Sequence, residues 1–298
     1  MNISILGKGA WGLAIGELLQ DGGHAVEWLD KGGHQFSDRT EMIVIALPTQ
    51  VVREVLQRVP MKVPQTPVVS LSKGIDIVTG QRISQIVAAQ WPEAPLVALS
   101  GPSLAGELRQ KVPTAMVAAS LSDKWSSLVQ GIFHGPFLRV YRSRDLVGVE
   151  WGGALKNIYA LAAGLCAGLG LGENSLAGLV TRSLREMTRI AVHFGAQEQT
   201  LHGLSGMGDL VLTSYSRASR NRRVGERIGA GDSLEKALRS VEGICEGVPS
   251  TQALHPILQS QRIDAPVAEE LYQILFKGKP PKEALLSLLS RDPKEERG

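Results

Sequence analysis

The chain contains little cysteine, and its hydrophobic stretches are short. Only two of its 298 residues are cysteines, Cys166 and Cys245, and both stand among small or apolar residues. We therefore expect two buried, reduced thiols, as in a cytoplasmic protein, rather than a disulfide framework. The most apolar stretch, residues 158–172, lies between Lys156 and Glu173 and is shorter than the roughly 18–20 residues that cross a bilayer. It predicts a buried helix, and no membrane partner is expected.

Excess charge and metal-ligand spacing are also lacking. The 32 lysines and arginines nearly balance the 29 aspartates and glutamates, so the overall charge does not indicate a nucleic-acid partner. Among the six histidines, His193 and His202 are too far apart for an i,i+4 pair, and no cysteine or carboxylate cluster joins them. No metal site is predicted. The first residues of the sequence form a strand pattern without a basic segment, so no signal peptide is expected.

A glycine-rich turn follows the first apolar run of the chain. Residues 3–6 lead into Gly7-Lys8-Gly9-Ala10-Trp11-Gly12, after which apolar residues recur at helical spacing. Gly7 permits the turn, Gly9 lets the backbone approach a pyrophosphate, and Gly12 lets the helix pack on the strand. The helix N-terminus then offers free N–H groups and a positive dipole end. This strand–turn–helix pattern predicts a dinucleotide site.

Strands and helices alternate through the first half of the chain. Apolar runs predict strands at 3–6, 25–29, 42–47, 67–71, 96–99, 114–119 and 137–141, and helical stripes cover 51–59 and 83–91. The alternation predicts an α/β Rossmann fold with a doubly wound, mostly parallel sheet. Because such sheets bind ligands at the carboxyl ends of their strands, the loops at 48–49, 72–74 and 100–103 are expected to line the site.

The choice between NAD and NADP stays open at this stage. Asp30 ends the second predicted strand, where a carboxylate often binds the adenosine ribose, although an ordinary strand-end aspartate is the alternative. Lys31 follows it and would suit a 2′-phosphate instead. The polar segment 31–41 is barely long enough for a parallel crossover, so we expect no full helix there.

From residue 146 onward no strand pattern returns. Helical patterns cover 147–167, 177–194, 234–241, 251–260, 269–276 and 282–289. We therefore expect a nucleotide-binding domain at 1–145 and an all-helical domain at 146–298.

Lys156 is a candidate catalytic residue, because it lies in the middle of a helix of apolar and small residues. A buried lysine is costly unless it is paired or used. Burial lowers its pKa toward the range in which it can transfer a proton. Two alternatives remain open: a lysine whose head reaches solvent, and a Schiff-base lysine.

A second group of polar residues follows further along the chain. Asp209 comes after a glycine-rich turn, and four arginines lie between Arg217 and Arg223, with Ser219 and Asn221 among them. Arginine and asparagine at a helix start suit a phosphate. A solvated basic face is the ordinary alternative, and RNA binding is a weaker one, because aromatic residues are not interleaved with the arginines.

Taken together, these motifs resemble the NAD(P)-dependent sn-glycerol-3-phosphate dehydrogenases of the bacterial and plastid type. The matching segments are 7–12, Ser72-Lys73-Gly74, 99–107, 148–157 with Gly-Ala-Leu-Lys-Asn, 203–210, Ser219-Arg220-Asn221 and 244–248. They run in the family's order and cover nearly the whole chain. The family's segment after the second strand is longer than 31–41, and Lys31 stands where the family usually has arginine.

The resemblance implies that the chain reduces dihydroxyacetone phosphate to sn-glycerol 3-phosphate with NADH or NADPH, for glycerophospholipid synthesis. It implies that Lys156 donates a proton to the carbonyl oxygen, and we expect Asp209 to keep that ammonium charged and oriented. The implied substrate residues are Lys73, Gly101, Ser103, Lys156, Asp209, Ser219, Arg220 and Asn221. The implied cofactor residues, besides the glycine-rich turn and Asp30, are Trp11, Lys31, Lys73, Ala105, Arg220, Ile244 and Glu246. A cytoplasmic homodimer is also implied.

Rival interpretations come from other classes of protein. A 6-phosphogluconate or 3-hydroxyacid dehydrogenase would share the two-domain plan but have a different motif around Lys156. A non-catalytic NAD(P)-binding regulator would have no reason to keep Lys156, Asp209 and Arg220-Asn221 together.

Overall fold

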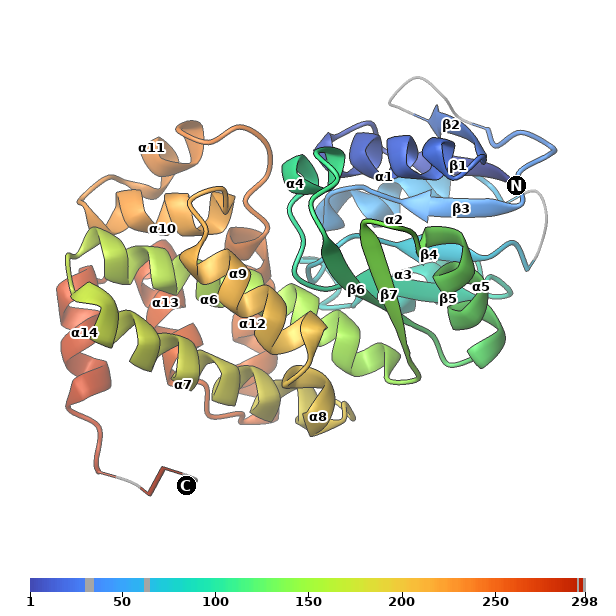
Figure 1. Ribbon diagram of the computed structural model, residues 1–298. Helices are drawn as coiled ribbons and strands as arrows, with labels where there is room; N and C mark the ends of the chain where they lie inside the picture. The colour runs from blue at the N-terminus through green and yellow to red at the C-terminus, as the bar shows by residue number, and fades with distance from the viewer. Residues whose placement is uncertain (30–34, 62–64, 294, 297–298) are drawn as a thin grey trace.

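Two halves of the molecule lie side by side, one built on a sheet and the other all helical (Figure 1). The computed structural model describes residues 1–29, 35–61, 65–293 and 295–296. The sheet half has seven strands in the order β2-β1-β3-β4-β5-β6-β7. The strands are β1 (Asn2–Leu6), β2 (Ala25–Leu29), β3 (Met42–Ile45), β4 (Val68–Ser70), β5 (Leu96–Ser100), β6 (Thr114–Ala119) and β7 (Leu138–Ser143).

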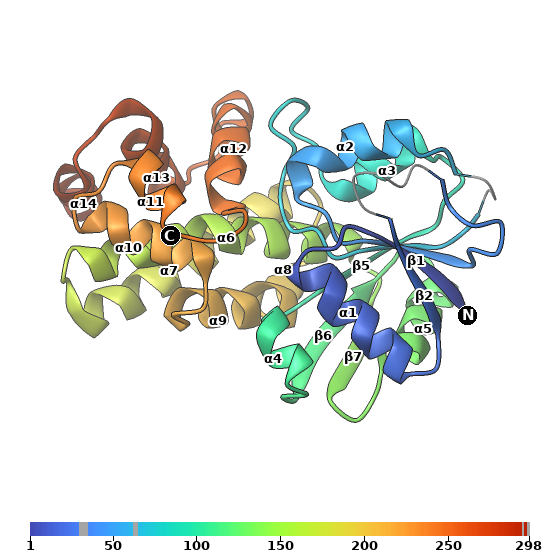
Figure 2. The ribbon, with the colours of Figure 1, turned by 90° about the horizontal axis from the view of Figure 1, so that it is seen from above.

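Helices cover both faces of this sheet (Figure 2). They are α1 (Ala10–Asp21), α2 (Thr49–Arg58), α3 (Ile83–Gln90), α4 (Ala105–Arg109) and α5 (Asp123–Phe133). Side chains alternate across a strand, so β3 serves two cores: Met42 and Val44 pack with α1 and α5, whereas Ile43 and Ile45 pack with α2 and α3. A strand that is buried on both faces must be apolar at every position, which explains why the sequence of β3 is an unbroken apolar run.

The strand directions confirm a mostly parallel, doubly wound sheet. Strands β1 to β5 are parallel, β6 runs antiparallel to β5, and β7 is parallel to β6. The strand order reverses at β1, which lies between β2 and β3, so the loops after β1 and β3 are neighbours at the switch point. Gly7 adopts φ +106°, and a Cβ there would lie 2.7 Å from the Ala46 carbonyl oxygen.

The second half has no strand among the residues that the structure describes. It comprises α6 (Leu146–Gly168), α7 (Gly172–His193), α8 (Glu198–Leu201), the π-helical turn η1 (Leu204–Gly208), α9 (Asp209–Tyr215), α10 (Arg220–Gly229), α11 (Leu234–Arg239), α12 (Gly247–Gln261), α13 (Pro266–Lys277) and α14 (Pro281–Leu289). Helix α6 is buried along nearly its whole length, as its apolar composition predicts. Cys166 and Cys245 are free and buried, as expected. In the described ranges, no helix is both long enough and apolar enough to span a bilayer.

Helices α6 and α10 touch through their backbones. A Cβ on Gly164 of α6 would lie 2.0 Å from the Arg222 carbonyl oxygen, and one on Gly225 of α10 would lie 2.0 Å from the Leu161 carbonyl oxygen. Only glycine fits at such distances. The contact brings the N-terminus of α10, with Asn221, beside the middle of α6.

Several elements differ from the sequence-based prediction. Helices α4, α5, α8, α9 and α10 were not predicted as separate helices, because they are short or lack a long apolar stripe. The basic segment 217–223 runs into α10, where the Ser219 hydroxyl accepts a hydrogen bond from the Arg222 N–H. Residues 35–41 form neither helix nor strand, as expected, whereas Asp30 and Lys31 lie outside the described residues.

Replacing Gly225 by alanine should destabilise the protein by about 2–3 kcal/mol, because neither backbone can yield a space for the methyl group. The matched control is Gly178→Ala on the exposed side of α7, where a Cβ meets nothing within 4 Å. That change should stabilise by roughly 0.5–1 kcal/mol. Urea unfolding of both variants measures the difference, and equal stabilities would contradict the backbone contact.

Candidate functional site

The glycine-rich turn joins β1 to α1 and leaves room for a ligand. A Cβ on Gly9 would meet nothing within 4 Å, whereas one on Gly12 would lie 2.0 Å from the Gly7 carbonyl oxygen. Gly12 is therefore required for helix–strand packing, and Gly9 faces open space. No side chain caps α1, so the N–H groups of its first turn, including those of Ala10 and Trp11, remain available to a phosphate.

A buried carboxylate joins two lysines from different parts of the chain. The Lys156 Nζ donates to Asp209 Oδ1 at 3.0 Å, and the Lys73 Nζ donates to Asp209 Oδ2 at 2.7 Å. Asp209 is completely buried, and Lys156 is 6% exposed. Lys156 comes from α6, Asp209 begins α9, and Lys73 follows β4. The cluster of Lys73, Lys156 and Asp209 therefore spans both halves.

The loops after the strands surround this cluster. The Lys73 Nζ also donates to the Gly101 carbonyl oxygen at 3.0 Å, and the Ser103 hydroxyl donates to the same oxygen at 2.9 Å. The Lys73 Nζ lies 5.9 Å from the centre of the Trp11 ring. The carboxyl ends of β1, β4 and β5 thus meet at the cluster.

The cluster carries one net positive charge when both lysines are protonated. Burial has the largest effect on Lys156 and lowers its pKa from 10.5 to about 8; Asp209 opposes that shift, and Lys73 adds to it. In the described part of the chain, Asp209 is the only hydrogen-bond partner of the Lys156 Nζ. The Nζ therefore keeps N–H groups free to donate to another oxygen.

Two asparagines connect this cluster to α10. The Asn221 Nδ2 donates to Asn157 Oδ1 at 2.8 Å, and the Asn157 Nδ2 donates to the Lys73 carbonyl oxygen at 2.9 Å. The Asn221 Oδ1 accepts from the Gly247 N–H at 2.9 Å and from the Cys245 thiol at 3.0 Å. Sequence reasoning gave Asn157 no role. Its signal was a polar side chain next to Lys156 in an otherwise apolar helix.

The remaining residues expected at the site surround the asparagines. Arg220 is exposed at the first position of α10, and a Cβ on Gly243 would lie 2.7 Å from its guanidinium. Glu246 precedes α12, and its Oε1 accepts from the Thr49 N–H at 2.9 Å. Burial raises the pKa of Glu246, an effect that its bond to Thr49 opposes.

Both halves of the chain match models of one dehydrogenase family. Residues 33–126 match the N-terminus, and residues 145–286 the C-terminus, of NAD-dependent glycerol-3-phosphate dehydrogenase. A glycerol-3-phosphate dehydrogenase [NAD(P)+] of Thermoanaerobacter sp. is 39% identical, with 99% of each chain covered. The chain belongs to the NAD-dependent glycerol-3-phosphate dehydrogenase family.

Other relatives agree with this assignment. The enzyme of Geobacter metallireducens is 44% identical over 87% of this chain and 78% of its own. The crystal structure of glycerol-3-phosphate dehydrogenase from Coxiella burnetii superimposes with a TM-score of 0.90 at 32% identity, and covers 97% of this chain and 99% of that one. The cofactor class of the family is NAD(P), and the chain is an oxidoreductase.

Two of the expected cofactor residues lie apart from the lysine–aspartate cluster. Ala105 begins α4 and packs against the core beside α1, and the Ile244 side chain is 44% exposed. Among the described residues, no group of three or more histidine, cysteine or acidic side chains could hold a metal ion.

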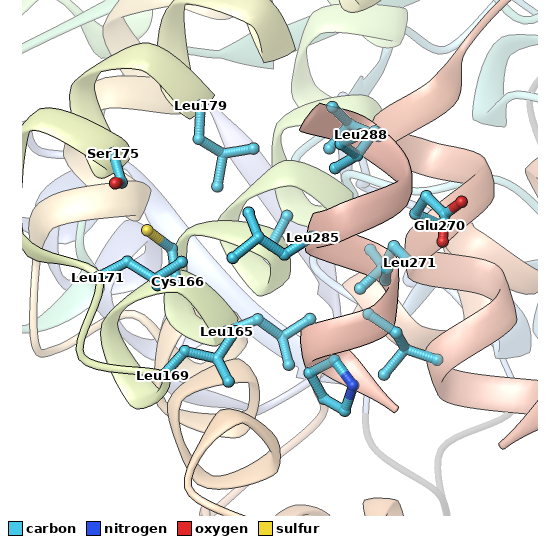
Figure 3. A pocket seen from close by; sticks show the side chains of 15 residues that line it. Leu165, Cys166, Leu169, Leu171, Ser175, Leu179, Glu270, Leu271, Leu285 and Leu288 are labelled. Carbon is cyan, nitrogen blue, oxygen red and sulfur yellow. The ribbon is translucent and has the colours of Figure 1, made fainter. Parts of the chain in front are cut away.

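A separate apolar pocket of about 100 Å³ lies in the helical half of this family member (Figure 3). Leu165 of α6, Leu169 just after α6, Leu179 of α7 and Leu285 of α14 line it. Its one carboxylate, Glu270, pairs with Lys279 at 2.6 Å. The pocket contains neither lysine of the cluster, so it is not suited to reduce a carbonyl group.

Replacing Asp209 by asparagine should lower the pKa of Lys156 below about 8, because Asp209 opposes the effect of burial. Nζ resonances of ¹⁵N-labelled lysine, followed against pH, measure the shift. Asp232→Asn is the matched control, since Asp232 pairs with Arg227 and Lys236 elsewhere in the helical half. An unchanged Lys156 titration in Asp209→Asn would contradict the pairing.

Proposed function

We propose that this chain reduces dihydroxyacetone phosphate to sn-glycerol 3-phosphate, reversibly, with NADH or NADPH. One observation carries the proposal: a buried lysine ammonium, held by a buried aspartate, lies where the sheet half meets the helical half. Membership of the family supplies the substrate class. The other dehydrogenase types considered from the sequence are not favoured by that membership.

The residues around the glycine-rich turn suit a dinucleotide. The free N–H groups of Ala10 and Trp11 would bind the pyrophosphate, and the open side of Gly9 leaves space for it. The second oxygen of Glu246, Oε2, is buried and has no hydrogen-bond partner among the described residues. Such an oxygen would accept from a ribose hydroxyl. Ala105, Ile244, Arg220 and Lys73 complete the proposed cofactor set, to which the sequence adds Asp30 and Lys31.

Lys156 is the proposed proton donor. When bound, NADH or NADPH would supply the hydride for the carbonyl carbon, and the residues of this chain would have to stabilise the negative charge on the carbonyl oxygen. The Lys156 Nζ would donate to that oxygen and transfer its proton to it, while Asp209 keeps the ammonium in place. Lys73 adds a second positive charge beside Asp209.

Ser219, Arg220 and Asn221 are the proposed phosphate residues, with Gly101 and Ser103 at the other end of the substrate. The α10 N-terminus favours an anion through its free N–H groups and its dipole. Arg220 would add a charge-assisted contact. Binding of the distant phosphate would position the reacting carbonyl group.

We also propose the domain division at residue 145. Strand β7 ends at Ser143 and α6 begins at Leu146. Asp145 caps α6 by accepting from the Gly148 N–H at 2.8 Å. The first turn of α6 still packs on the sheet, through Leu146 and Val149, so α6 contacts both domains.

We further propose that the protein is a cytoplasmic homodimer that supplies glycerophospholipid synthesis. The family resemblance supports this proposal. Leu286 and Leu289 on α14 are 64% and 72% exposed, and a second copy would cover such an apolar surface.

Purified protein should oxidise NADH, NADPH or both when dihydroxyacetone phosphate is added, as measured by loss of absorbance at about 340 nm. Dihydroxyacetone without the phosphate should react far more slowly, because it lacks the group that positions it. No absorbance loss with either cofactor, from protein with a helical circular dichroism spectrum, would remove the proposed function.

The rate of reduction should fall as pH rises through about 8, because Lys156 loses the proton that it must donate. Oxidation of glycerol 3-phosphate should instead become faster over the same range, since the neutral amine then accepts the proton. Lys156→Met should lower kcat by roughly 10²–10⁴ while NADH still binds. Lys236→Met, on exposed α11, is the matched control, and near-normal turnover in Lys156→Met would assign the proton to another group.

A further inference from the structure

A hydrogen bond between the halves joins Glu246 to the start of α2. The Glu246 Oε1, just before α12, accepts from the backbone N–H of Thr49 at 2.9 Å. Thr49 is the first residue of α2, which packs on the sheet. The two residues are 197 positions apart. This contact therefore exists only when the helical half and the sheet half are seated on each other.

The bond supplies a cap that α2 lacks in its own sequence. The residue before the helix is Pro48, whose side chain makes no capping hydrogen bond. The first N–H groups of a helix have no partner within the helix, and a carboxylate there gains both a charge-assisted bond and a favourable dipole interaction. The helical half thus completes a helix of the sheet half.

The bond lies close to the lysine–aspartate cluster. A Cβ on Gly74 would lie 2.6 Å from the Thr49 hydroxyl and 2.9 Å from Glu246 Oε2, and Gly74 follows Lys73 directly. On the other side of Glu246, the Gly247 N–H donates to Asn221. Movement of Glu246 relative to Thr49 would therefore shift Lys73 relative to α10.

We propose that Glu246, through its bond to the Thr49 N–H, is a positioning residue that seats the sheet half against the helical half for reaction. This role rests on the proposed function and is separate from the cofactor contact proposed for Oε2. The bond fixes the distance between Lys73 of the sheet half and Asn221 of the helical half. It would therefore set the proposed cofactor site of the sheet half against Lys156 and the phosphate residues of the helical half.

One substitution removes the donor and leaves the helix intact. Thr49→Pro deletes the N–H at the first helical position, where proline is favoured. Pro48, with φ −56° and ψ 139°, already has the conformation that a residue before proline requires. The matched control is Thr49→Val, which removes the hydroxyl but keeps the N–H.

We expect Thr49→Pro to lower kcat about tenfold, the size of a lost charge-assisted bond, with the NADH dissociation constant within about threefold of wild type. Thr49→Val keeps the N–H and should lower kcat much less than Thr49→Pro does. Glu246→Ala should lower kcat and also weaken NADH binding. Glu246→Gln should recover most of the kcat, because its amide oxygen still accepts from Thr49.

The double variant separates a positioning role from two unrelated defects. If the bond is the common cause, Thr49→Pro should cost nothing further in kcat in the Glu246→Ala background. Independent, multiplying losses would overturn the proposal. So would equal kcat values for Thr49→Pro and Thr49→Val.

A readout without substrate keeps this test distinct from the proposed function. In hydrogen–deuterium exchange, the first turn of α2 should exchange faster in Glu246→Ala than in wild type or Glu246→Gln. Unchanged exchange would overturn the proposal even in an active enzyme. Wild-type protein inactive on dihydroxyacetone phosphate would remove the proposed function, while the exchange result would still decide whether the halves are joined here.

Discussion

The carboxylate of Asp209, buried between two ammonium groups, is the interaction on which the rest of the site depends. A carboxylate without water and without a partner is strongly unfavourable, and removing one partner of a buried ion pair typically costs about 3–5 kcal/mol. Asp209 is fully buried, and its two oxygens bind Lys156 and Lys73 separately. Because Lys73 comes from the sheet half, this carboxylate is satisfied only when the halves are packed together. The charges that would carry out the reaction therefore also help to hold the fold in its working arrangement.

Backbone packing sets the precision of that arrangement. Gly164 and Gly225 let α6 and α10 approach until each Cα faces a carbonyl oxygen of the other helix. At that distance the side chains of Asn157 and Asn221 reach each other. Asn157 then binds the backbone of Lys73. A close contact between two helices thus determines where a lysine of the other half lies, through one pair of amides.

Much of the fold could be predicted from the sequence, because its strands are buried on both faces and its central helix is apolar throughout. Strands β2 and β6 have the bounds that their apolar runs predict. The antiparallel direction of β6 could not be predicted, since an apolar run carries no sign of direction. Helix α10 begins in a basic segment with few apolar residues, where periodicity is weak. The backbone of Leu161, against which α10 packs, could not be identified from the sequence either.

The candidate site, like the fold, could be predicted from the sequence only in part. Lys156 could be selected from the sequence because a lysine buried in an apolar helix is energetically costly unless it is paired or takes part in function. Its bond to Asp209 was a hypothesis, and the bond from Lys73 to Asp209, over 136 positions, depends on how the halves meet. The contact between Glu246 and Thr49 likewise depends on how the two halves meet. Local sequence specifies helices and turns, whereas contacts between the halves arise from their shapes.

The pKa of Lys156 follows from its burial and from its bond to Asp209, and it suits a reversible reaction. Burial alone would drive the ammonium toward its neutral form, and Asp209 limits that effect, so that the pKa lies at about 8. A lysine of pKa 10.5 would be a poor proton donor near neutral pH. Almost none of it would be present as the neutral amine that could accept a proton in the reverse reaction. At about 8, both protonation states are populated near neutrality: the ammonium for reduction and the amine for oxidation. The net positive charge of Lys73, Lys156 and Asp209 also favours an anionic substrate and the oxygen charge that develops during reduction. Asp209 thus sets how readily Lys156 gives up its proton, and the second lysine, Lys73, keeps the net charge of the site positive.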